Sequence, residues 1–152
     1  MGNRQQNRQQ ATGDREVRVQ PALTALGRRA RLAPVRAMGR HLLADLYECR
    51  HELLDDPVAL EALAVEAVTR SHGTVVSRHH HHFEPSGVSV VIMVAESHLA
   101  LHTWPEHRYV GVDYFTCGPS VEPRLAIELM RDALQPRRHR IREVQRGDEL
   151  DP

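Results

Sequence analysis

Lysine is absent from this chain: all 20 of its basic residues are arginine, and they balance 20 acidic residues. Without a lysine amine, the chain cannot form an internal aldimine with pyridoxal phosphate, a lysine Schiff base or the phosphate contact of a Walker-type loop. Any chemistry on an amine or a carbonyl therefore needs an electrophile other than one built on lysine.

Long hydrophobic runs and cysteines are also scarce. The longest apolar run, residues 88–95, is interrupted by a serine and is too short to cross a bilayer, and nothing near the start resembles the apolar part of a secretory signal. We therefore expect a cytoplasmic protein with no membrane partner, in which Cys49 and Cys117 stay reduced. A length of 152 residues favours one domain.

The balanced charge hides a gradient. Residues 1–40 carry nine arginines against two acidic residues, and the remainder carries 11 arginines against 18 acidic residues. Residues 1–37 lack serine, tyrosine, phenylalanine and any sustained apolar period, which predicts a disordered, passive arm with no nucleic-acid partner. Because Met38 directly precedes the first predicted strand, it is a candidate for the true start, which an intact mass containing residues 1–37 would contradict.

Apolar periodicity changes at residue 40. Two amphipathic helices are predicted over residues 58–71 and 121–134, the first introduced by Asp55 as cap, Asp56 as first-turn acid and Pro57. Strands are predicted over residues 41–49, 74–83, 88–95, 99–103 and 109–117, of which 88–95 resembles a buried strand.

The predicted element order is β-α-β-β-β-β-α. It indicates an α+β fold, a two-layer sandwich in which two helices pack on one face of an antiparallel sheet. The domain is expected to span residues 38–135, and the arginine-rich tail, residues 136–152, is expected to form at most a short exposed helix with a frayed end.

Polar side chains concentrate over residues 95–106, where the chain leaves an apolar strand. Ser97 and His102 are five residues apart, so they face opposite sides of a regular strand unless a bend intervenes. A serine hydrolase and a structural polar ladder are both open, although the chain has no Gly-x-Ser-x-Gly motif.

Several motifs in order resemble the S-adenosylmethionine decarboxylase proenzymes of the bacterial and archaeal type. The matching segments are residues 39–45, 83–89, 95–98, 102–106 and 113–118. Their common order and spacing make the resemblance specific over residues 38–135.

This resemblance implies that the chain makes its own electrophile. In the family the bond corresponding to Glu96-Ser97 cleaves itself, and the serine becomes a pyruvoyl group, which forms a Schiff base with the substrate amine and accepts electrons as CO2 leaves. It implies chains of residues 1–96 and 97–152 that stay together, in a homodimer. Decarboxylated S-adenosylmethionine would supply the aminopropyl donor for spermidine synthesis.

Residue roles also follow from the resemblance. His102 matches the processing base that removes a Cα proton, Ser89 a serine that stabilises the processing intermediate, and Cys117 the acid that protonates the substrate Cα. Phe83 matches an aromatic residue that stacks on adenine, and Glu106 a carboxylate that binds the ribose hydroxyls. Cys49 has no matched role, which favours a buried structural residue.

The histidine run at residues 79–82 departs from the family pattern. Alternation places His80 and His82 on one face of a strand and His79 and His81 on the other, so each face offers half of a closed metal site, and we expect no functional metal. Two alternative functions stay open: a pyruvoyl-dependent decarboxylase of arginine or ornithine, and a non-catalytic binding module with the same fold.

Overall fold

The computed structural model describes residues 37–148. The predicted disordered arm lies outside the described residues except for Ala37, as does the end of the tail from residue 149. Among the described residues, no helix is long and apolar enough to cross a membrane.

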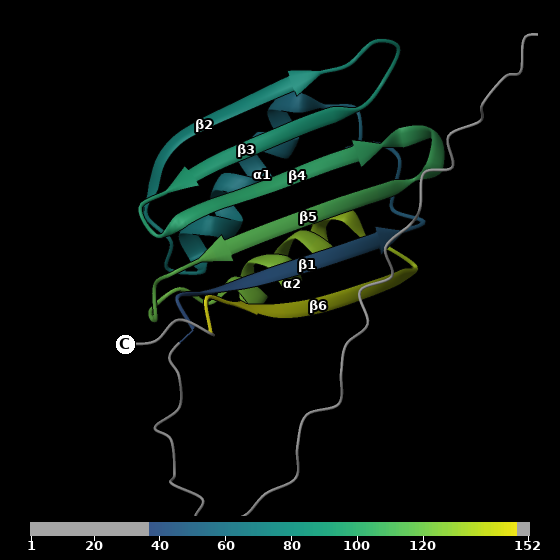
Figure 1. Ribbon diagram of the computed structural model, residues 1–152. Coiled ribbons are helices and arrows are strands. Elements are labelled where there is room, and N and C mark those ends of the chain that lie inside the picture. Colours follow the sequence, from purple (N-terminus) through teal and green to yellow (C-terminus); the bar gives the residue numbers. More distant parts are fainter. Residues whose placement is uncertain (1–36, 149–152) are drawn as a thin grey trace, which may run out of the picture. The chain divides into compact units, whose positions relative to one another are not determined.

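Six antiparallel strands form one sheet in the order β2-β3-β4-β5-β1-β6 (Figure 1). Their bounds are β1 Gly39–Tyr47, β2 Val75–His82, β3 Val88–Val94, β4 Ser97–Trp104, β5 Tyr109–Thr116 and β6 Arg138–Arg146. Two α-helices, α1 Pro57–Arg70 and α2 Pro123–Leu134, and a short 3-10 helix, η1 Pro105–His107, complete the elements. The predicted α+β sandwich is thereby confirmed.

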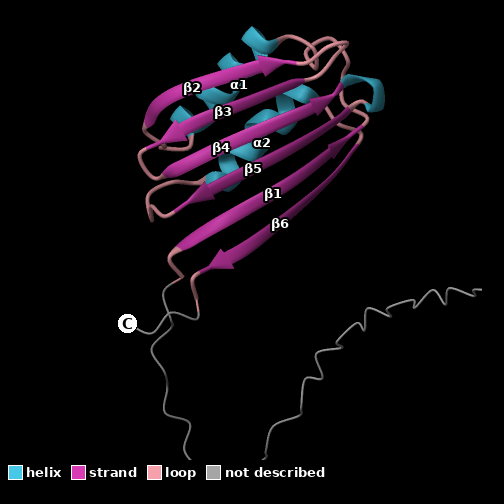
Figure 2. Ribbon diagram, turned by 45° about the horizontal axis from the view of Figure 1, so that its top comes forward, coloured by secondary structure: helices cyan, strands magenta, loops and turns pink. Residues whose placement is uncertain are grey.

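Both α-helices cover the same face of the sheet and leave the other face open (Figure 2). Helix α1 packs on β2, β3 and β4, and α2 packs on β1 and β5. Along the four inner strands, β3, β4, β5 and β1, alternate residues are buried beneath them, including Leu42, Ile92, Leu101 and Tyr114. The core therefore lies in one layer between the sheet and the helices.

Strand β3 is buried on one face only, which corrects the prediction of a buried strand. Val90 and Ile92 are fully buried beneath the helices, whereas Met93 on the open face is 45% exposed. A mostly apolar run such as this has the same sequence pattern whether the strand is buried on both faces or has one open apolar face.

The prediction for the tail is wrong, because Arg138–Arg146 forms the edge strand β6. It pairs with β1 along its length, from Gly39 opposite Arg146 to Tyr47 opposite Arg138. Its arginines, at positions 138, 140, 142 and 146, share the open face with Val144, and Arg142 Nη2 lies 3.5 Å from Asp45 Oδ2 there. Strands are usually predicted from apolar residues at every second position, and in β6 these positions are mostly arginine.

The start of α1 is also corrected. Asp56, not Asp55, caps the helix, since Asp56 Oδ1 accepts hydrogen bonds from Val58 N and Ala59 N, each at 3.0 Å. Pro57 occupies the first helical turn, where its missing N–H is not needed, so the residue directly before it becomes the cap. Asp55 is therefore free to bond elsewhere.

Candidate functional site

Ser97 begins β4 directly after the two-residue turn formed by Ala95 and Glu96. Its φ of 144° lies in a region that favours glycine and that other residues occupy at a cost of about 1–3 kcal/mol. The fold thus holds a serine hydroxyl at a strained peptide, next to the bond that the sequence singled out.

Both the side chain and the backbone carbonyl of Glu96 are held by hydrogen bonds. Its carboxylate accepts hydrogen bonds from the backbone N and the hydroxyl of Thr74, at 3.1 and 3.2 Å, and the Thr74 N–H in particular lowers the pKa of Glu96. The Glu96 carbonyl oxygen accepts a hydrogen bond from the Cys117 backbone N–H at 2.9 Å. This N–H polarises the carbonyl and can stabilise negative charge on its oxygen.

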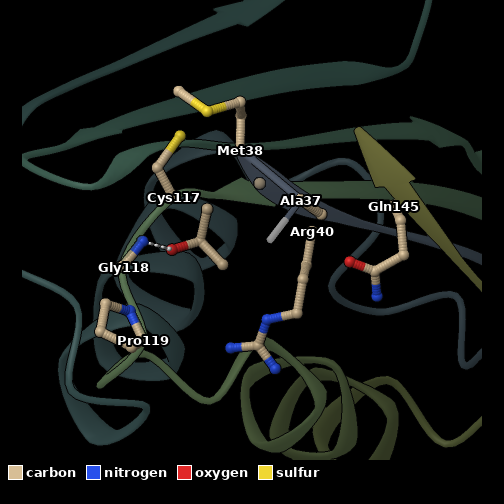
Figure 3. Close-up of a pocket in the computed structure, with 9 residues that line it drawn as sticks. Ala37, Met38, Arg40, Cys117, Gly118, Pro119 and Gln145 are labelled. Carbon is tan, nitrogen blue, oxygen red and sulfur yellow. Dashed lines mark hydrogen bonds between the residues drawn. The ribbon is translucent and has the colours of Figure 1, made fainter. Parts of the chain in front are cut away.

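Cys117 lies on the same end of the sheet, where Ser97 pairs with Thr116. Its thiol is free and exposed, at the rim of a cavity of about 620 Å³ that Met38 and Arg40 also line (Figure 3). We call Glu96, Ser97 and Cys117 the cleavage half-site. It combines a serine hydroxyl, a carbonyl that accepts a backbone hydrogen bond and an exposed thiol.

The remaining predicted residues gather around a second cavity, of about 460 Å³, which we call the histidine half-site. Phe83, Ser89, His102 and Glu106 all line it. Ser89 Oγ lies 2.6 Å from His102 Nδ1, so the serine fixes the orientation of the imidazole. Phe83 is 46% exposed, so its ring is accessible at this cavity.

Asp55, predicted from the sequence to cap α1, instead supports this half-site through Gly87, which lines its cavity. Its Oδ1 accepts a hydrogen bond from Gly87 N at 2.8 Å and lies 2.9 Å from His82 Nε2. These bonds, the one from Gly87 first, lower the pKa of Asp55. Asp55 therefore pins the turn that follows Phe83, and the only sequence signal for it was a second acid before Pro57.

The two half-sites lie far apart within one chain. Ser97 and His102 stand on the same strand, β4, five residues apart, and a strand rises about 3.3 Å per residue, which separates them by about 16 Å. Ser89 pairs with His102, and Thr116 pairs with Ser97, so each half-site keeps to its own end of the sheet. His102 therefore cannot contact Ser97 of the same chain.

The histidine run has the predicted alternation. His80 Nδ1 lies 2.6 Å from Glu61 Oε2, and with His82 it faces the helices, whereas His79 and His81 pair with Val91 and Ser89 of the open face. Within residues 37–148, no group of three or more histidine, cysteine or acidic side chains could hold a metal ion.

Comparison with known proteins identifies the family. The family model described as S-adenosylmethionine decarboxylase matches residues 40–147. The chain is 42% identical over 113 residues to the S-adenosylmethionine decarboxylase proenzyme of Thermotoga maritima, covering 74% of this chain and 87% of that protein. It is 38% identical over 117 residues to the protein of the same name from Pseudomonas aeruginosa, covering 77% and 73%.

A solved structure agrees with these relatives. The crystal structure of the adenosylmethionine decarboxylase from Aquifex aeolicus has a TM-score of 0.70 and 34% identity, and the match covers 77% of this chain and 98% of that one. The chain therefore belongs to the S-adenosylmethionine decarboxylase family, which confirms the resemblance inferred from the motifs. The family match extends through β6, beyond the end of the predicted domain at residue 135.

Proposed function

We propose that this chain is a cytoplasmic proenzyme that cleaves itself between Glu96 and Ser97 and then decarboxylates S-adenosylmethionine, supplying the aminopropyl donor for spermidine synthesis. One observation carries the proposal: a strained serine follows a carbonyl that already accepts a hydrogen bond from the Cys117 backbone. A purely structural turn would be expected to carry glycine at this φ.

Cleavage needs only groups that this protein supplies and water. Ser97 Oγ attacks the Glu96 carbonyl carbon, the C–N bond breaks, and the peptide becomes an ester, while the Cys117 N–H stabilises the charge on the carbonyl oxygen. His102 of a second copy of the chain, rather than the distant His102 of the same chain, then removes the Ser97 Cα proton, which expels Glu96 as a carboxylate. Addition of water and loss of ammonia convert the remaining residue to a pyruvoyl group.

The residues of the cleavage half-site fit such a group. A pyruvoyl group supplies a carbonyl that takes up the electron pair released with CO2. A chain without lysine needs such a group because it cannot form an internal aldimine with pyridoxal phosphate. Cys117 is the candidate that donates its thiol proton to the substrate Cα, because its thiol is exposed and it directly follows Thr116, which pairs with Ser97.

Substrate recognition is assigned to the histidine half-site. The exposed ring of Phe83 offers a stacking surface for adenine and a cation–π contact of about 0.5–2 kcal/mol for the sulfonium. Glu106 lines the same cavity and can accept hydrogen bonds from the ribose hydroxyls.

A homodimer would join the two half-sites. The open face carries apolar side chains that no helix covers, among them Met93 and Trp104, which are 45% and 40% exposed. If two copies pack these faces about a twofold axis with their strands antiparallel, Ser97 of each copy approaches His102 of the other. Because Ser97 and His102 lie about 16 Å apart within one chain, only a second copy can bring a His102 side chain to Ser97.

Release of labelled CO2 tests the substrate. Purified protein is given carboxyl-labelled S-adenosylmethionine, arginine or ornithine in parallel. We expect release from S-adenosylmethionine alone, and none from any substrate with Ser97→Ala. Release from arginine or ornithine would support the same machinery acting on another amino acid, and an uncleaved, inactive chain would support a non-catalytic binding module.

A further inference from the structure

Ser97 has an imidazole of its own in addition to the distant His102. Ser97 Oγ lies 3.2 Å from His98 Nδ1. Among the described residues, no other imidazole and no carboxylate is hydrogen-bonded to this hydroxyl. The Glu96 carboxylate is next in sequence but is bonded to Thr74 instead.

The fold fixes the His98 ring. His98 is half-buried on the open face of β4, opposite Met93 of β3 and Phe115 of β5. Its ring centroid lies 6.1 Å from that of Phe115, with a tilt of 55° between the planes. Packing against an aromatic neighbour limits the rotation of the ring and keeps Nδ1 near the hydroxyl.

We propose that His98 is the general base that activates Ser97 for the first step of cleavage, which rests on the self-processing function proposed above. A serine hydroxyl is a weak nucleophile unless an adjacent base takes its proton. His98 is in hydrogen-bond contact with the attacking oxygen, whereas His102 of the same chain stands at the opposite end of β4, so that only His102 of a second copy could approach Ser97.

The step balances within the chain. The Ser97 hydroxyl proton moves to His98 Nδ1 as Ser97 Oγ forms its bond to the Glu96 carbonyl carbon. The C–N bond then breaks, and the proton on His98 passes to the departing Ser97 nitrogen, which becomes the free amine of the ester. His98 thus returns to the state in which it began the step.

Two histidines thus divide processing between them. His98 acts before the ester exists, and His102 acts on the ester. Hydroxylamine separates the two stages, because it cuts an ester but leaves an amide intact. A chain that stalls before the ester resists hydroxylamine, and a chain that stalls at the ester is cut by it between Glu96 and Ser97.

The test follows newly made full-length chain, pulse-labelled in a cell-free translation system, on denaturing gels with and without hydroxylamine. His98→Phe retains a ring against Phe115 but lacks the nitrogens, and His98→Gln retains hydrogen bonding without a proton acceptor of comparable basicity. We expect both to slow cleavage about 100-fold and to accumulate hydroxylamine-resistant precursor, since a general base contributes about 10²–10⁴-fold. Added imidazole should partly restore cleavage in His98→Ala.

Two variants serve as controls. His102→Ala should accumulate the hydroxylamine-sensitive ester, and His139→Ala, on the exposed edge strand β6, should cleave at the wild-type rate. Cleavage of His98→Phe at the wild-type rate would overturn the assignment, as would a hydroxylamine-sensitive ester in the His98 variants or the absence of rescue by imidazole. An intact wild-type chain would instead overturn the self-processing function itself.

Discussion

At the scale of single residues, the two cysteines occupy opposite environments. Cys49 is buried, and burial raises the pKa of its thiol to about 11, whereas Cys117 is exposed at the cavity of the cleavage half-site. Because the thiolate is the reactive form, Cys49 stays protonated and shielded at pH 8.

Alkylation is expected to separate them. Iodoacetamide at pH 8 should add one group to the native protein, at Cys117, and two groups after denaturation. Peptide mass spectrometry locates the modified residue. Modification of native Cys49 at a comparable rate would contradict its burial, and Cys117→Ala, which should take up no reagent when native, is the control.

Cys117→Ala also isolates the thiol from the backbone N–H of the same residue. The substitution keeps the hydrogen bond from residue 117 to the Glu96 carbonyl, so cleavage should persist. Turnover should fall by roughly 10²–10⁴-fold, the usual contribution of a positioned acid, and protonation at the wrong carbon should slowly inactivate the enzyme. Labelled CO2 release together with intact mass measures both, and unchanged turnover would remove the thiol from the mechanism.

At the scale of elements, the adjacent residues Asp55 and Asp56 have separate tasks. Asp56→Ala removes the cap of α1 and should cost about 1 kcal/mol of folding free energy without altering KM. Asp55→Asn removes the charge that holds the Gly87 N–H, so the turn after Phe83 should loosen and KM for S-adenosylmethionine should rise several-fold, with a smaller change in kcat. Urea unfolding and steady-state kinetics on both variants check this, and equal effects on KM would contradict it.

Acid should loosen the same turn. The folded-state pKa of Asp55 is lowered, so its contribution to stability is present above the unfolded-state pKa near 3.9 and is lost as the pH falls through the lower folded value. The chain has one tryptophan, Trp104, which lines this cavity. Its fluorescence should change below about pH 4 in the wild type. Asp55→Asn should lack that transition, and an identical titration of both proteins would contradict the link.

The elements differ in how readily the sequence reveals them. Helix α1 and strands β1 to β5 follow from apolar periodicity and turn residues, and the structure places their ends within about two residues of the predicted ones. Strand β6 was missed because its arginines alternate toward the open face without an apolar stripe. The predicted cap of α1 was one residue too early, because Pro57 occupies the first helical turn and the residue directly before it, Asp56, is the cap.

At the scale of the whole molecule, the motifs predict which residues form the site but not how the sheet distributes them. Ser97 and His102 are close in sequence, yet one extended strand holds them about 16 Å apart. Only the pairing of β3, β4 and β5 shows that Ser89 joins His102 and that Cys117 joins Ser97. Local sequence carries little information about such long-range register.

Complementation tests whether two copies share a site. Ser97→Ala and His102→Ala should each fail to form a pyruvoyl group alone. When both are co-expressed, mixed dimers contain one site with Ser97 from one copy and His102 from the other, so part of the His102→Ala chain should mature and CO2 release should return. A tag on one chain allows mixed dimers to be isolated, and their inactivity would place the whole site within a single copy.

The intact mass of the purified wild-type protein under denaturing conditions tests most directly whether the chain cleaves itself and forms a pyruvoyl group. We expect two chains, formed by cleavage between Glu96 and Ser97, with the chain of residues 97–152 lighter by one ammonia than simple hydrolysis would leave it. Ser97→Ala should give one uncut chain. A single intact wild-type chain, or a fragment that begins with an unmodified serine, would contradict the claim that this protein builds its electrophile from its own backbone.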